Sequence, residues 1–204
     1  MFKRLLQGAA DGVKSLATQT ADAVELAKIG ARLQSLVSGG NFAKLKALVD
    51  MLVAKTGGAA GSVSDAPAAL KKIFDPAHLS TMWDLVVRVS KSIIFLRSTI
   101  KSTPAVADPL KEVLASIRAL RAVKTAADME RCVRDLETKL KTVKTLVGQD
   151  GGILHWLIDS IIEGLANIIA KGFNFSGDFV TGVAIDSIDT QLSVLEIILS
   201  YVLE

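Results

Sequence analysis

Three residues in the last quarter of the chain carry side chains that could bind a metal ion or transfer protons. His155, Asp159 and Glu163 are each four positions apart in the sequence. On an α-helix this spacing places the imidazole and the two carboxylates along one face. An imidazole with carboxylates is a ligand set for divalent transition metals, and the same groups can act as general acids and bases.

The sequence favours a simpler interpretation of these three residues. Helical bundles that hold metals take ligands from several helices, often as Glu-x-x-His motifs. No Glu-x-x-His occurs in this chain, and His78 is the only other histidine. His155, Asp159 and Glu163 are therefore weak metal candidates, and the polar face of an amphipathic helix is the favoured interpretation.

Other residues with reactive side chains lack the neighbours that catalysis requires. Cys132 is the single cysteine, so an internal disulfide is excluded, and no histidine lies within two helical turns of it. The glycine-rich segment 56–64 is not followed by Gly-Lys-Ser/Thr, as a phosphate-binding loop would be. No Gly-x-Ser-x-Gly turn presents a serine. We expect a protein that is not an enzyme, with no cofactor and no small-molecule substrate.

The elements that carry the His155 group are unusually apolar. In residues 153–171, polar residues recur every fourth position from His155 to Lys171, and most others are Leu, Ile or Ala. After a short loop at 172–178, a second apolar segment continues to the end of the chain, with polar residues at three- and four-residue steps from Asp186 to Glu204. The sequence therefore predicts an apolar helical hairpin at 151–204. Such helices must be covered by protein or by lipid. We expect contacts with other subunits through the following apolar residues: Trp156, Ile161, Leu165, Ile169, Leu195 and Leu199.

The first helix of this hairpin has the length of a membrane span but carries two acids. Asp159 and Glu163 at mid-depth would cost about 5–7 kcal/mol, whereas its Leu and Ile residues return about 3–5 kcal/mol. This balance opposes spanning by a single helix. A pair of helices with the acids turned inward, or a helix lying in the membrane interface, is the alternative.

The charges of the chain are divided unevenly along its length. Residues 1–150 hold 23 Lys and Arg against 14 Asp and Glu, whereas residues 151–204 hold one Lys against seven acids. The two parts could complement each other within one fold or between subunits. Alternatively, the basic part meets an anionic partner such as lipid headgroups or nucleic acid. The residues expected to make that contact are Arg118, Arg121, Arg131, Arg134, Lys141 and Lys144. Acids interleave with them and no aromatic side chain is among them, so nucleic acid is the less favoured partner.

Helical periodicity runs through the rest of the chain. Thr125-Ala-Ala-Asp128 has the form of a capping box and precedes a heptad seam from Met129 to Val147. The pattern predicts an all-α fold, a bundle of about seven or eight helices. Residues 1–55 would form N-terminal helices, 56–64 a flexible linker and 65–204 the main bundle, or the whole chain a single domain.

These patterns lead to three hypotheses about function. The leading one is a non-enzymatic structural protein, a subunit of a shell, filament or larger complex that self-associates through apolar helix faces. The second is a membrane-active or membrane-peripheral protein of the pore-forming type that uses the hairpin, and the third is a nucleic-acid-packaging protein that uses residues 109–147. The start of the chain lacks the apolar region of a signal peptide, so we expect an intracellular protein or a component of an assembled particle.

Overall fold

The protein has an all-α fold, as the sequence predicts. The computed structural model describes residues 20–37, 40–58, 60–171 and 180–203. These residues form eight α-helices and three short 3-10 helices, and no strand occurs among them. Residues 1–19 and 172–179, which the sequence assigns to the first helix and to the turn of the C-terminal hairpin, lie outside the described residues.

The chain divides into two compact units. Residues 1–53 and 57–90 belong to the first unit, and residues 54–56 and 91–204 belong to the second. Helix α5 (Leu79–Ser102) contributes its first half to one unit and its second half to the other. The domain boundaries expected from the sequence remain a prediction.

The first unit is built on a small apolar core. It contains α2 (Thr20–Val37), all but the last three residues of α3 (Phe42–Thr56), a 3-10 turn (Val63–Asp65), α4 (Ala68–Ile73) and the start of α5. Helix α2 packs on α4. Gly30 permits this approach, because a Cβ atom there would lie 2.2 Å from the side chain of Leu70. Tertiary packing on such a core stabilises short helices that would be marginal in isolation.

Hydrogen bonds attach the glycine-rich segment to α5 in this unit. The indole of Trp83 donates to the carbonyl of Ser62 at 2.9 Å, and Arg88 donates to the carbonyl of Gly58 at 2.6 Å. Asp84 accepts from Arg88 at 2.5 Å, and both side chains are buried. The side chains of the buried ion pair therefore also hold the segment in place. No pattern in the sequence indicates this contact.

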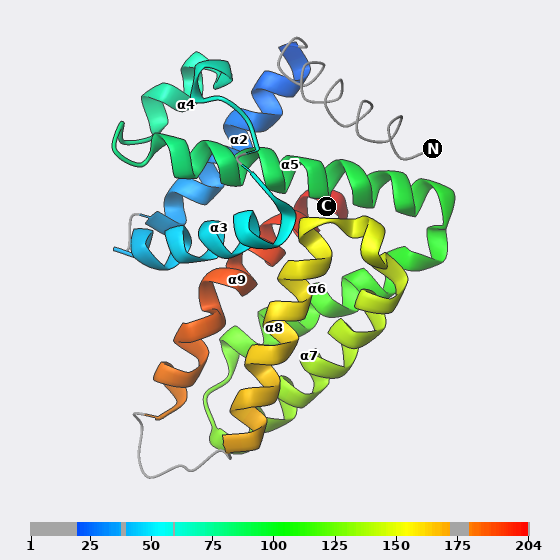
Figure 1. Ribbon diagram of the computed structural model, residues 1–204. Helices are drawn as coiled ribbons and strands as arrows, with labels where there is room; N and C mark the ends of the chain where they lie inside the picture. Colours follow the sequence, from blue (N-terminus) through cyan, green and yellow to red (C-terminus); the bar gives the residue numbers. More distant parts are fainter. Residues whose placement is uncertain (1–19, 38–39, 59, 172–179, 204) are drawn as a thin grey trace. The chain divides into compact units, whose positions relative to one another are not determined.

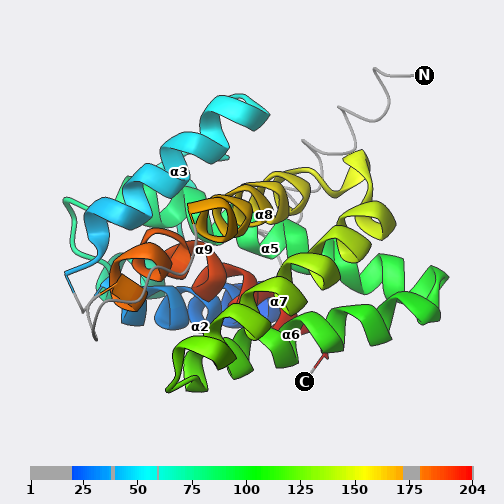
Figure 2. The ribbon, with the colours of Figure 1, turned by 90° about the horizontal axis from the view of Figure 1, so that it is seen from below.

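Four helices of the second unit pack in a closed ring. They are α6 (Ala107–Ala122), α7 (Ala126–Val147), α8 (Ile153–Lys171) and α9 (Val180–Leu203). Helix α6 packs on α7, α7 on α8, α8 on α9, and α9 on α6 (Figures 1 and 2). The short connections between α6 and α7 and between α7 and α8 make these neighbours antiparallel.

The capping box predicted at the start of α7 forms in the structure, and glycines follow the end of the helix. The hydroxyl of Thr125 accepts a hydrogen bond from the backbone N–H of Asp128 at 3.2 Å, which caps the helix. Gly148 ends the helix with φ of +61° and Gly152 precedes α8 with φ of +54°, a region that favours glycine. Between these ends the predicted heptad seam is buried throughout: Met129, Val133, Leu136, Leu140, Val143 and Val147.

Candidate functional site

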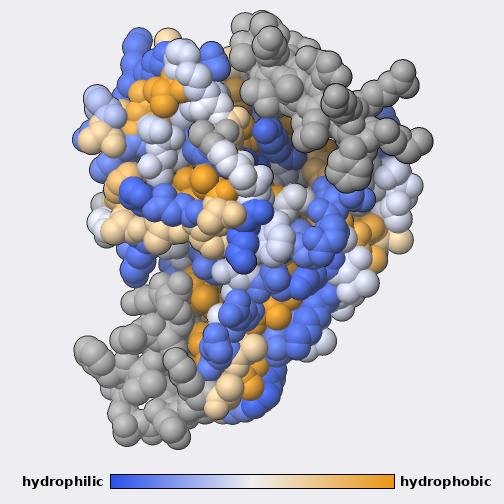
Figure 3. Space-filling model, viewed as in Figure 1, coloured by the Kyte–Doolittle hydropathy of each residue, from blue (hydrophilic) through white to orange (hydrophobic). Residues whose placement is uncertain are grey.

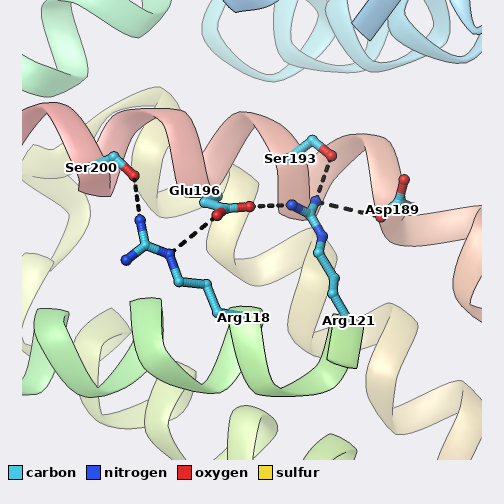
Figure 4. Close-up of polar contacts among 6 residues, drawn as sticks. All are labelled: Arg118, Arg121, Asp189, Ser193, Glu196 and Ser200. Carbon is cyan, nitrogen blue, oxygen red and sulfur yellow. Dashed lines mark hydrogen bonds and ion pairs between the residues drawn. The ribbon is translucent and has the colours of Figure 1, made fainter. Parts of the chain in front are cut away.

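The most extensive polar contact among the described residues joins α6 to α9. Two arginines of α6 point toward four polar residues that α9 presents at three- and four-residue steps, so that all four lie on one face (Figure 4). We call this group the α6–α9 polar seam. Its members are Arg118, Arg121, Asp189, Ser193, Glu196 and Ser200.

Glu196 is the centre of this seam. Its carboxylate accepts from Arg118 Nε at 3.4 Å and also from Arg121 Nη1, and only 21% of its side chain is exposed. Arg121 donates to the hydroxyl of Ser193 at 2.6 Å, and Arg118 to that of Ser200 at 3.3 Å. Charge-assisted hydrogen bonds in a partly dry setting are stronger than ordinary ones. The seam therefore ties α9 to α6.

The chemistry of the seam is that of a structural contact. Both buried hydroxyls, of Ser193 and Ser200, accept from guanidinium groups. Arginine stays protonated in proteins, so it cannot take a proton from a serine hydroxyl. A guanidinium donor therefore does not activate either serine as a nucleophile.

A second ionic contact joins α7 to α8. Lys144 pairs with Asp159 across the two helices, and both side chains are partly exposed. Asp159 is therefore turned toward a lysine of α7. Together with the polar seam, this pair shows that acids of the C-terminal hairpin meet bases of the preceding helices within one chain. The basic and acidic parts of the sequence therefore neutralise each other, at least in part, through ion pairs within one chain.

The remaining basic residues expected to bind an anion pair along α7 itself. Arg131 lies 2.7 Å from Asp128, Arg134 2.8 Å from Glu130, and Lys141 2.7 Å from Glu137. Each of the six predicted anion contacts, Arg118, Arg121, Arg131, Arg134, Lys141 and Lys144, thus has an acidic partner in the chain. Exposed pairs of this kind contribute about 0–1 kcal/mol, so an anion could displace them. Binding of nucleic acid remains a prediction without a specific contact to support it.

The three weak metal candidates do not converge. The side chain of His155 is buried, its Nε2 lies 3.1 Å from Gln149 Nε2, and its ring meets Trp156 edge to face. Asp159 pairs with Lys144, and Glu163 is exposed. In the part of the chain that the structure describes, no group of three or more His, Cys, Asp and Glu side chains could hold a metal ion.

Most of the apolar residues expected to contact other subunits belong to the core of this chain. Ile161, Leu165, Leu195 and Leu199 are almost completely buried. Trp156 and Ile169 are half-buried, and the ammonium group of Lys55 lies 5.3 Å from the centre of the Trp156 ring. The four buried residues stabilise the monomer and could meet a partner only if the bundle opened.

A polar cluster that no sequence pattern indicated lies between α6 and α7. Ser116 donates to Asp135 at 2.7 Å, and Lys139 donates to the Ser116 hydroxyl at 2.9 Å and pairs with Asp135 at 2.9 Å. Partial burial raises the pKa of Asp135. The hydrogen bonds from Lys139 and Ser116 and the charge of Lys139 together lower it by more than burial raises it, so the pKa of Asp135 lies below its ordinary value. The four-residue spacing of Asp135 and Lys139 could have revealed their pairing, but not the role of Ser116.

Neither comparison with known proteins nor the hydropathy of the helices identifies a function for this chain. Comparison of the chain with protein-family models, curated proteins and solved structures gave no match. Among the described residues, one stretch of α8, Ile153–Ala170, has a length and mean hydropathy (1.5) that would suit a membrane span. Core helices of soluble proteins share these properties, and 39% of the stretch is buried. The function therefore has to be argued from the fold itself.

Proposed function

We propose that the protein is a non-enzymatic helical subunit that works by associating with copies of itself. The observation that supports this proposal is the uneven cover of the apolar stripe on α8. Leu154, Leu157 and Ile161 in the first half of the helix are fully buried. Ile168 and Ile169, which continue the same stripe at the far end, are only half-buried. The stripe therefore extends beyond the part that the chain's own helices cover completely.

The chemical character of this end of α8 is consistent with a protein contact. Ile162 and Ala166 are also half-buried and adjoin Ile169 on the helix surface. Figure 3 shows that hydrophobic residues are interspersed with hydrophilic ones on the face that it presents. We call Ile162, Ala166, Ile168 and Ile169 the distal α8 patch. It replaces the buried residues Ile161, Leu165, Leu195 and Leu199 as the proposed contact.

The size of the distal α8 patch predicts weak association for each contact. Completing the burial of a half-buried isoleucine contributes at most roughly 1 kcal/mol, so the three isoleucines of the patch contribute at most roughly 3 kcal/mol. Association costs at least about 4 kcal/mol of lost translational and rotational freedom. A single contact of this size would therefore not hold two subunits together by itself. Stable association requires several contacts per subunit, as in a shell or filament.

Sedimentation velocity over a range of protein concentrations tests this proposal. We expect the average mass to rise with concentration. Ile169→Ser should weaken self-association roughly fivefold, because it removes about 1 kcal/mol of apolar contact. Leu146→Ser is the matched control, since Leu146 is 43% exposed on α7, outside the patch. A wild-type protein that stays monomeric up to millimolar concentration, or equal effects of the two substitutions, would overturn the proposal.

A membrane-peripheral role is the second candidate, and the apolar stretch Ile153–Ala170 is the observation that favours it. Spanning remains opposed by Asp159 and Glu163, and lifting α8 out of the bundle would also break the pair of Asp159 with Lys144. A helix lying in the interface is the form that these residues allow. Flotation with liposomes, with and without anionic lipid, tests it: a protein that stays in the lipid-free fraction in both cases has no such role. The expected location, inside the cell or in an assembled particle, is part of the main proposal.

A further inference from the structure

An apolar groove of about 540 Å³ lies between α2 and α4 in the first unit. Alanines make up most of its lining, with Ala27 in the middle of the part from α2 and Ala68 and Ala69 from α4. Val24 in the groove is 56% exposed, and Lys28, which also lines it, is exposed. Small side chains allow a second helix to approach closely, so the groove suits a helix that carries larger apolar side chains.

The distal α8 patch complements this groove in shape and charge. Ile162 and Ile169 are separated by about 10 Å along the helix, with Ala166 between them on the same face. The stretch of α2 that lines the groove, residues 23–31, is about 12 Å long. Glu163 adjoins the patch and is exposed. An acid beside large apolar side chains on α8 therefore matches a base beside small ones in a groove of similar length.

We propose that the distal α8 patch of one copy docks, antiparallel to α2, in the α2–α4 groove of a second copy. This inference rests on the proposed function and names the surface that the patch meets. The two surfaces are different, so each subunit uses its patch on one neighbour and its groove on another. Such head-to-tail contacts build a ring when the rotation between subunits closes and a filament when it does not.

The direction of docking follows from the positions of the groove and the charge on α2. Gly30, three positions after Ala27, faces Leu70 of α4, so α4 lies on that side of Ala27. Lys28 comes one position after Ala27 and lies on the opposite side, because each residue of a helix turns by about 100°. A docked helix must therefore turn its large apolar side chains toward α4 and its acid toward Lys28.

Antiparallel packing of α8 meets both requirements. When Ala166 faces Ala27 in this direction, Glu163 lies on the Lys28 side of the contact. Ile169 then lies on the side of α4. The axial offset between the two charged residues is about 3 Å, because both are displaced in the same direction from the facing alanines, by three positions on α8 and by one on α2. Parallel packing would instead turn the acid toward α4.

Disulfide trapping between two different single-cysteine proteins tests this contact. Both are full-length chains with Cys132→Ala, which removes the native cysteine; one also has Ala27→Cys and the other Ala166→Cys. A disulfide requires Cα atoms within about 7 Å, so diamide should produce the mixed dimer at least roughly tenfold faster than either protein forms a dimer with itself. Ala47→Cys, exposed on α3, is the matched control for Ala27→Cys and should show no such preference.

Exchange of the two charges tests the direction of docking. Glu163→Lys and Lys28→Glu each place like charges across the contact and should weaken self-association roughly fivefold in sedimentation velocity. The double substitution restores opposite charges at every contact, so its dissociation constant should return to within about twofold of the wild-type value. Glu112→Lys, on the exposed surface of α6, changes the net charge equally and should have no effect.

The outcomes separate this inference from the proposed function. Preferential disulfides between positions 27 and 166, together with rescue by the double substitution, support the docking. Association that Ile169→Ser weakens, but without that preference, overturns the docking and leaves the proposed function intact; faster bonding of position 166 to itself would show that the patch meets a second patch. The preference without charge rescue overturns the antiparallel direction. A wild-type protein that stays monomeric overturns both proposals.

Discussion

The role of Asp135 follows from the two side chains that contact it. It accepts a hydrogen bond from Ser116 on α6 and pairs with Lys139 one turn away on α7. A serine beside a lysine could suggest a nucleophile and its base. Here Lys139 donates its hydrogen bond to the Ser116 hydroxyl and pairs with the Asp135 carboxylate, so it acts as a donor toward the serine. The cluster is therefore a polar bridge between two helices.

The lowered pKa of Asp135 predicts a specific loss of stability in acid. The unfolded carboxyl titrates near its ordinary pKa of 3.8, and the folded one below that value. The contribution of Asp135 to stability is thus fully present well above pH 4, and it is lost as the pH falls toward and through the lower, folded pKa. Between pH 6 and pH 3, urea unfolding should show a larger loss of stability for the wild type than for Asp135→Asn. Equal losses would contradict this assignment.

His155 illustrates a residue whose chemistry the fold does not use. Its ring is buried beside Trp156, and its Nδ1 atom has no hydrogen-bond partner in the described part of the chain. The spacing that aligned it with Asp159 and Glu163 is correct for a helix. The two carboxylates nevertheless lie in different surroundings, one paired with a lysine and the other exposed. Alignment along one helix does not produce a site when no second helix adds ligands.

At the scale of elements, the α6–α9 polar seam determines how the last helix is held. The apolar residues of α9 bury against the bundle, but they occupy most of its circumference and so constrain the rotation of the helix about its axis only weakly. Arg118 and Arg121 constrain this rotation further, because their guanidinium groups can form hydrogen bonds with Glu196 only when α9 turns that residue toward α6. The register of α9 therefore depends on charged residues from a helix about 75 positions earlier.

Removing the charge of Glu196 should loosen α9. Glu196→Gln leaves two exposed arginines with a weaker acceptor, and we expect a loss of about 1 kcal/mol in the free energy of unfolding, since the carboxylate is mostly buried but its partners are not. Glu130→Gln is the control, because its pair with Arg134 lies on the exposed face of α7 and should contribute under about 0.5 kcal/mol. Urea denaturation measures both. Similar losses for the two substitutions would indicate that the seam has no structural importance.

At the scale of the whole molecule, two compact units share the continuous helix α5. Independent domains are usually joined by a linker that few contacts cross. A helix that belongs to both units instead predicts that unfolding of one affects the other. The position of the glycine-rich segment 56–64 in the sequence, by contrast, suggests a boundary, and the hydrogen bonds from Trp83 and Arg88 attach part of this segment to α5.

The two tryptophans allow this coupling to be measured. Trp83 lies in the first unit and Trp156 in the second, so Trp156→Phe and Trp83→Phe each leave one fluorescent reporter. Leu136→Ala removes a fully buried side chain from the second unit and should cost about 2–5 kcal/mol. We expect it to shift the unfolding midpoint seen by both reporters. A shift seen only by Trp156 would show that the units unfold independently.

The sequence alone determined the helical architecture, because local physical chemistry specifies it. Three- and four-residue apolar steps predict the helices, and the capping residue Thr125 predicts the start of α7. The buried seam of α7 and the apolar character of α8 and α9 follow from the same periodicity. These features depend on residues within a turn or two of one another, which the sequence shows directly.

Only the tertiary structure decided what covers each face and which charges meet. Ile161, Leu165, Leu195 and Leu199 are apolar in sequence whether they face a partner or the chain's own core, and the packing of α6, α7, α8 and α9 made them core. Arg121 and Glu196 carry no local sign that they will pair, because their contact depends on the closure of the whole ring of helices. Helix formation is a local property of the chain, whereas burial and ion pairing depend on segments that are distant in sequence.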